Sequence, residues 1–281
     1  MTTTTPILDN HLHLDLERGR GIEAVTDFAR SGGTHLLVVN RPSWQLGVEV
    51  ADGEDFRIAF EATLDAVDAA NEVLSGRAWP VLGVHPALIS RLVDQRGLTV
   101  QRATELMMAG IDVAAAYVAD GRALALKSGR PHYPVDPPVW EASNEVLRHA
   151  FDSAAAIDCA VQLHTEASED LTELTDWAAD VGLPAHRVVK HYAGGRLAGP
   201  VPSVMSSREY LEVAVERGAP FLMETDFLDD PDRPGAVLGP KTVPRRVAWL
   251  VERGDEAAVQ MAHVETPRLV YDIDTVATLD R

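Results

Sequence analysis

The sequence contains very little cysteine and no segment typical of export or membrane insertion. Cys159 is its only cysteine, so no disulfide can form within the chain and nothing indicates an oxidising compartment. The N-terminal residues Met1–Pro6 have neither the basic nor the apolar region of a signal peptide. No uncharged apolar run reaches the roughly 18 residues that a membrane helix needs. These absences predict a cytoplasmic protein with no membrane partner.

Positive charge is also scarce. Aspartate and glutamate total 43 against 25 lysine and arginine, a net charge of −18, and the only lysines are Lys127, Lys190 and Lys241. Two explanations fit: an acidic surface that keeps a protein dispersed in a salt-rich cytoplasm, or a GC-rich genome that replaces lysine codons with arginine codons. With either explanation, so negative a surface disfavours DNA as a partner unless a local site holds it.

Strand-like apolar runs alternate with amphipathic helical stretches along the whole chain. The predicted strands span residues 7–14, 35–40, 78–84, 123–127, 159–164, 188–191, 201–205 and 221–225. The helical stretches span residues 22–30, 55–74, 99–118, 140–156, 168–181, 210–217 and 244–251. This order indicates an α/β fold with a parallel sheet. Eight strands favour one (β/α)8 TIM-barrel domain over residues 1–281 rather than an open doubly wound sheet, and no Gly-x-Gly-x-x-Gly follows the first strand.

The first predicted strand ends in two histidines, His11 and His13. Side chains two positions apart on a strand point to the same face, so both imidazoles can bind one divalent cation. Such a pair alone is weak support for a metal site, because two histidines on a strand can simply be surface residues. The later strands decide the question.

Polar, metal-competent residues also occur at the ends of the later predicted strands. They are His85, Lys127, His164, His191 and Asp226. Active sites of α/β barrels lie at the C-terminal ends of the strands, where these side chains can converge. One such histidine would more often be a hydrogen-bonded core residue. The whole set predicts a metal site.

Four segments together resemble the TatD-like branch of the amidohydrolase superfamily, a group of metal-dependent hydrolases. They are Asp9-Asn10-His11-Leu12-His13, Gly83-Val84-His85-Pro86, Gln162-Leu163-His164-Thr165-Glu166 and Glu224-Thr225-Asp226. Two further segments, residues 128–135 and 234–241, are similar to a largely archaeal subgroup of that family. The resemblance covers nearly the whole chain and is specific for fold and metal, but not for substrate.

The resemblance implies a site for two divalent metal ions. His11, His13 and Asp226 would hold the more buried ion, and His164 and His191 the second. Zinc is the expected metal, with manganese, magnesium, iron or nickel as alternatives. Water shared by two cations has a lowered pKa, and Asp226 is the expected general base for its attack on the substrate.

Lys127 departs from the family pattern, because TatD-like proteins carry a glutamate at this position. An ammonium beside two divalent cations would be repelled. Two solutions fit. Lys127 can take up CO2 to form a carbamate that bridges the metals, as in the phosphotriesterase-like relatives, or it can remain charged and displace the second metal.

The substrate contacts are predicted with structural alternatives beside them. The candidates are His85, Arg130, His132 and Lys241. His85 could instead cap its loop, and Arg130 and His132 could hold their loop by hydrogen bonds. Lys241 is expected either to contribute to a phosphate site after the eighth strand or to lie at a solvated helix start. Glu166 and Glu224 are expected to orient metal ligands.

Three functions fit this sequence. The favoured one is hydrolysis of a phosphoester, including TatD-like deoxyribonuclease activity. The second is hydrolysis of a small ester, lactone, amide or phosphotriester, which the lysine at the bridging position favours. The third is a catalytically silent barrel that binds metal only for stability. The motifs carry no information on oligomeric state.

Overall fold

The computed structural model describes residues 5–279, so the first four and last two residues of the predicted domain lie outside the described part. The strands are β1 Leu8–His13, β2 His35–Val39, β3 Ala78–Gly83, β4 Ala125–Gly129, β5 Val161–His164, β6 Val188–Ala193, β7 Val201–Met205, β8 Leu222–Glu224 and β9 Phe227–Leu228. The α-helices are α1 Ile22–Arg30, α2 Phe56–Leu74, α3 Leu88–Ser90, α4 Val100–Ala119, α5 Pro137–Ala156, α6 Thr172–Asp180, α7 Arg208–Arg217, α8 Thr242–Glu252, α9 Glu256–Gln260, α10 Thr266–Tyr271 and α11 Thr275–Leu279. Four short turns of other helix types are η1 Ser43–Leu46, η2 Arg91–Gln95, η3 Ala185–Arg187 and η4 Met261–Glu265.

All the strands belong to one parallel sheet, in the order β8-β7-β6-β5-β4-β3-β2-β1-β9. Its two edge strands, β8 and β9, are joined by only Thr225 and Asp226, so the sheet curls until its edges meet. The backbone N–H of Asp226 donates to the carbonyl of His11 at 2.9 Å across this junction. The prediction of an α/β fold with a parallel sheet is confirmed, and its architecture is TIM-barrel-like.

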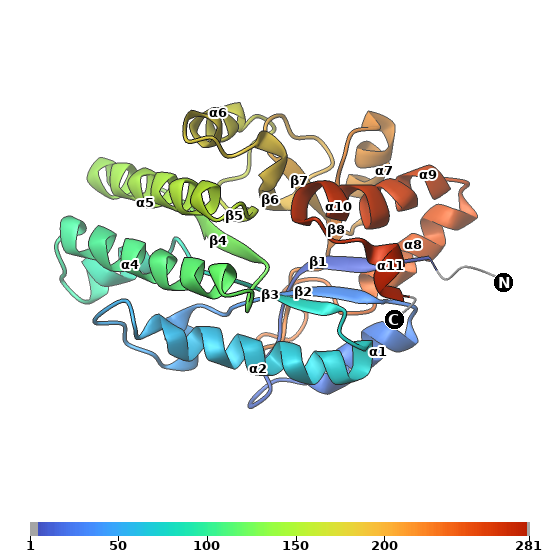
Figure 1. Ribbon diagram of the computed structural model, residues 1–281, viewed down its shortest axis with the longest axis horizontal. Helices are drawn as coiled ribbons and strands as arrows, with labels where there is room; N and C mark the ends of the chain where they lie inside the picture. Colours follow the sequence, from blue (N-terminus) through green and yellow to red (C-terminus); the bar gives the residue numbers. More distant parts are fainter. Residues whose placement is uncertain (1–4, 280–281) are drawn as a thin grey trace.

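The helices lie on the outside of the sheet (Figure 1), and their buried apolar residues pack against it. In α1, the buried residues Ala24, Val25 and Phe28 recur at helical spacing, while charged residues face solvent. The largest apolar cluster lies between α2, α4, α5 and α6 and strands β3 to β6, with Phe60 and Phe151 fully buried in it. Every residue of β2 is buried, as expected for a strand covered on both faces.

Several boundaries differ from the prediction by two to four residues. Helix α5 begins at Pro137 rather than at residue 140, because Pro137 and Pro138 fit a first helical turn, where no N–H partner is needed. Helix α6 begins at Thr172 rather than at residue 168, because Asp170 accepts from the N–H of Thr172 at 2.9 Å and so precedes the helix. Strand β4 runs to Gly129, which puts Lys127 at its centre rather than at its end.

Two glycines allow β3, β4 and β5 to approach closely near the site. A Cβ on Gly83 would collide with the backbone of Lys127, and a Cβ on Gly129 would collide with the backbone of His164. Gly129 also has a φ of 150°, at the edge of the range that side chains rarely adopt. No described helix has the combined length and hydropathy required to cross a bilayer.

Candidate metal centre

His11 and His13 project from β1 with their rings held by the protein. The Nδ1 of His11 lies 2.7 Å from the Oε1 of Gln162, whose amide nitrogen is already donating to the Asn10 carbonyl and the Tyr271 hydroxyl. The Nδ1 of His13 lies 2.8 Å from the carbonyl of Val39. Both acceptors require a proton on Nδ1, so each Nε2 carries a free lone pair. This is the arrangement that orients metal-binding histidines.

Asp226 faces these two Nε2 atoms. Its Oδ1 lies 3.8 Å from the Nε2 of His11 and 3.8 Å from that of His13, too far for hydrogen bonds. All three ligand atoms lie within 4.8 Å of one another. Within residues 5–279, the buried Nε2 of His11 has no hydrogen-bond partner. Three ligands of the types that zinc prefers, one of them otherwise unsatisfied, fit a divalent cation.

The backbone around Asp226 is strained and firmly held. Asp226 has a φ of 49°, in the left-handed region that non-glycine residues rarely occupy. The preceding residue, Thr225, donates to the Asp9 carboxylate from its N–H at 3.0 Å and from its hydroxyl at 2.6 Å. Burial raises the pKa of Asp226 to about 6, partly offset by the charges of Lys127 and Lys190.

A second group consists of His11, His191 and Glu224, whose ligand atoms also lie within 4.8 Å of one another. Glu224 is fully buried and accepts from the backbone N–H of Tyr192 at 2.6 Å and from the Ser203 hydroxyl. The Nδ1 of His191 lies 3.3 Å from its Oε1. From the sequence, Glu224 was expected only to orient a metal ligand. Its place two residues before Asp226 was the available signal for a ligand.

The other predicted histidines form a continuous row of rings with His191. The Nδ1 of His164 lies 2.8 Å from the Nε2 of His191, and its Nε2 lies 2.9 Å from the Nδ1 of His132. The ring of His191 stacks on His11 at a centroid distance of 3.9 Å. Burial, followed by neighbouring charges, holds the pKa of His11, His164 and His191 well below the ordinary value. Neutral imidazoles can lie this close together and are the form that binds metal.

Lys127 lies among these ligands. The residue is only 2% exposed, and burial lowers its pKa to about 8 in spite of the Asp226 and Glu224 carboxylates. Its charge contributes, after burial, to lowering the pKa of His11 and His13. Within residues 5–279 it forms no ion pair with a carboxylate within 4.0 Å. Lys190, which no motif marked as a site residue, is also buried and donates to the His191 carbonyl at 2.5 Å.

Two of the predicted substrate contacts border this row. The ring of His85 lies 4.4 Å from that of His164 between centroids, and its Nδ1 accepts from the Ala87 N–H at 3.1 Å. His85 thus caps its loop and faces the site at the same time. His132 reaches the site through its hydrogen bond to His164.

Arg130 and Lys241 are engaged by carboxylates instead. The buried guanidinium of Arg130 donates to Glu166 at 2.9 Å and to Glu173 at 2.6 Å, and lies 4.6 Å from the ring centroid of Trp140. Lys241 forms an ion pair with Asp27 at 3.0 Å. These partners favour the structural alternatives over substrate contact. Glu166 consequently orients Arg130 and has no described hydrogen bond to a metal-site histidine.

The site is a histidine–carboxylate centre of the metal-binding class, at the C-terminal ends of the strands of a curled parallel sheet. The family model for TatD related DNase matches residues 8–271, and the chain belongs to this family. An uncharacterised protein of Methanocaldococcus jannaschii, MJ1127, is 35% identical over 281 residues, covering 96% of each chain.

Two solved structures share the fold at low identity. The TatD homologue YjjV of Escherichia coli K12 is 16% identical with a TM-score of 0.57, over 96% of this chain and 99% of its own. The lactonase Lmo2620 of Listeria monocytogenes is 13% identical with a TM-score of 0.58, over 96% of this chain and 95% of its own.

Proposed function

We propose that the protein is a metal-dependent hydrolase that acts on small uncharged esters, lactones, amides or phosphotriesters. The observation that carries this proposal is the convergence of the His11 and His13 Nε2 atoms on the Asp226 carboxylate, with both Nδ1 atoms already bound. This set binds a divalent cation through His11, His13 and Asp226, and the neighbouring His191, His164 and Glu224 offer ligands for a second ion. Zinc is the favoured metal.

Each protein residue has a role in this scheme. A bound divalent cation supplies Lewis acidity, which polarises the scissile oxygen and lowers the pKa of water. Asp226, whose side chain is 18% exposed, accepts the proton of the attacking water. Gln162 and Val39 fix the rings of His11 and His13. His85 and His132, which lie next to His164 in the row of imidazole rings, contact the substrate.

Lys127 is proposed to add CO2 through its neutral amine, with loss of a proton; the resulting carbamate would supply an anionic ligand to the two ions. It is buried among imidazoles and carboxylates, and no ion pair within residues 5–279 holds it as an ammonium. Electron density extending beyond Nζ, between two ions, is the expected result in crystals grown with zinc and bicarbonate. A bare ammonium beside a single ion would contradict the bridging role.

The favoured substrate is uncharged because the cations expected to bind phosphate are neutralised. Arg130 is paired with Glu166 and Glu173, and Lys241 with Asp27. The net charge of −18 also opposes a polyanion. Phosphoester hydrolysis, including deoxyribonuclease activity, is the second candidate, and the name of the matched family favours it.

Metal reconstitution followed by substrate assays tests this proposal. Protein stripped by a chelator and reloaded with zinc or manganese is assayed against a lactone, an uncharged aryl ester, a phosphotriester, a phosphodiester and single-stranded DNA. Turnover of the uncharged substrates is expected, with Asp226→Asn lowering kcat by about 10²–10⁴-fold while metal is retained. Turnover of the phosphodiester or DNA alone would favour the second candidate. Metal-dependent stability without any turnover would indicate a silent barrel.

A further inference from the structure

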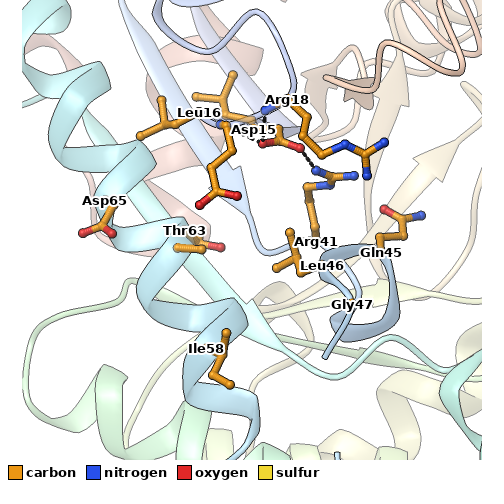
Figure 2. A pocket seen from close by; sticks show the side chains of 13 residues that line it. Asp15, Leu16, Arg18, Arg41, Gln45, Leu46, Gly47, Ile58, Thr63 and Asp65 are labelled. Atoms are coloured by element: carbon orange, nitrogen blue, oxygen red, sulfur yellow. Dashed lines mark hydrogen bonds and ion pairs between the residues drawn. The ribbon is translucent and has the colours of Figure 1, made fainter. Parts of the chain in front are cut away.

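A cavity of about 550 Å³ lies next to the end of β1, the strand that carries His11 and His13. Figure 2 shows the residues that line it. It is lined by Leu14–Arg18 after β1, by Arg41 and Gln45–Gly47 after β2, and by four residues of α2. Its volume is in the usual range for small-molecule sites. No motif in the sequence marked it.

The wall of this cavity exposes apolar side chains. Leu16 is 42% exposed and Ile58 is 58% exposed, and both line the same space with Leu14, Leu46 and Ala62. Figure 2 shows Ile58 on α2 and Leu46 at the end of η1, both among the residues that line the cavity. Single exposed apolar residues are ordinary, but several around one concavity are typical of a binding site.

Two polar side chains of the lining have unpaired atoms, but these atoms are buried. Arg41 is only 5% exposed, and its guanidinium pairs with Asp15 through Nη1. Within residues 5–279, its Nε and the Oε1 of Gln45 have no hydrogen-bond partner, and both atoms are closed off from solvent. The surface that the cavity offers to a ligand is therefore mainly that of its apolar side chains.

The charges around the cavity disfavour an anion. The two arginines of the lining are paired, Arg41 with Asp15 and Arg18 with Asp232, the latter at 2.8 Å. Two further carboxylates, Glu17 and Asp65, form no ion pair in the described part of the chain. They leave the lining net negative.

Two connections link the lining of the cavity to residues of the metal centre. Leu14 directly follows the ligand His13, whose Nδ1 is bound to Val39, two residues before Arg41. In η1, Trp44 packs its ring edge against His85 at a centroid distance of 5.5 Å, while the next residue, Gln45, lines the cavity. A substrate extending from the metal centre along β1 and β2 would reach this space.

We infer that this cavity binds an uncharged aliphatic portion of the substrate. The alkyl chain packs against Leu16, Leu46 and Ile58. This inference rests on the proposed function for its connection to catalysis, but the binding itself needs no turnover.

Calorimetric titration with hexanamide tests the binding directly, with hexanoate and hexylammonium as charged probes of the same chain length. The wild type is expected to bind hexanamide more tightly than either charged probe. Ala62→Phe, which fills the cavity, and the double variant Leu16→Ser/Ile58→Ser, which removes its exposed wall, are expected to weaken hexanamide binding about tenfold or more. Ala69→Phe, two turns further along α2 and outside the lining, is the control and should bind as the wild type does.

A second measurement separates this inference from the proposed function. With a series of N-acyl substrates of increasing chain length, kcat/KM should rise by up to about fourfold per methylene, and Ala62→Phe should abolish the increase. Hexanamide binding without any hydrolysis would contradict the proposed function and leave the cavity assignment standing. Hydrolysis with no chain-length effect, together with equal hexanamide affinity in wild type and Ala62→Phe, would overturn the cavity assignment alone. Tighter binding of hexanoate would also overturn it.

Discussion

The Asp9 carboxylate accepts two hydrogen bonds from Thr225, a residue 216 positions later in the sequence. One comes from the backbone N–H at 3.0 Å and the other from the hydroxyl at 2.6 Å. Asp9 precedes the ligands of β1, and Thr225 precedes Asp226, whose φ is 49°. This pair therefore joins β1 to the short segment between β8 and β9, at the point where the three proposed ligands meet.

Replacing Thr225 with valine removes the hydroxyl while preserving the shape of the side chain. Because Asp9 then loses one donor, the left-handed backbone of Asp226 is held less firmly. We expect zinc affinity to fall about 10- to 100-fold, the range found when groups that orient metal ligands are removed. Competition with a chromogenic chelator measures this. Thr225→Ser, which keeps the hydroxyl, is the control, and equal affinity in both variants would contradict the positioning role.

Arg130 is expected to support stability rather than substrate binding. Arg130→Met leaves Glu166 and Glu173 without their buried cationic partner, so the free energy of unfolding should fall by about 3 kcal/mol. Chemical denaturation measures this loss. Arg102→Met removes a surface ion pair to Glu105 in α4 and should have almost no effect. An unchanged stability of Arg130→Met with a raised KM would instead restore the predicted substrate contact.

His263 makes the fold sensitive to acid. Its Nδ1 accepts from the Leu8 N–H at 3.0 Å, and burial, with a smaller effect of His35, lowers its pKa from 6.5 to about 3. Below pH 6.5, His263 binds a proton in the unfolded chain. In the folded chain it stays neutral until the pH approaches its lowered pKa of about 3. Its contribution to stability is therefore lost as the pH falls through this interval, by about 1.4 kcal/mol per pH unit.

The variant His263→Gln keeps an acceptor for Leu8 but cannot titrate. We expect the stability difference between wild type and this variant to change by about 2 kcal/mol, to the disadvantage of the wild type, between about pH 7 and about pH 5. Urea unfolding at both pH values measures it. A difference that does not depend on pH would show that His263 is not the sensitive group.

The sequence predicted the elements better than the contacts between them. The i, i+2 spacing of His11 and His13 was enough to place both on one face of β1, because strand geometry fixes that relationship. The bonds that orient them come from Gln162, 151 residues away from His11, and from Val39 in the next strand. The periodicity of a strand predicts the face on which a side chain lies, but not which distant residue it contacts there.

The remaining differences have the same origin. Lys127 lies at the centre of β4 rather than at its end, because the strand continues to Gly129, where the absence of a side chain permits close approach to β5. From the sequence, Arg130 was predicted to contact the substrate. Its partner Glu173 lies 43 residues away along the chain, so the sequence alone did not show that the two are paired. The cavity is formed from three separate segments, none of which is a motif.

The central claim is tested most directly by the anomalous scattering of crystals grown with zinc. The account predicts an ion bounded by the Nε2 atoms of His11 and His13 and the Oδ1 of Asp226. The absence of an ion between these three atoms, with zinc bound only at surface carboxylates, would contradict it.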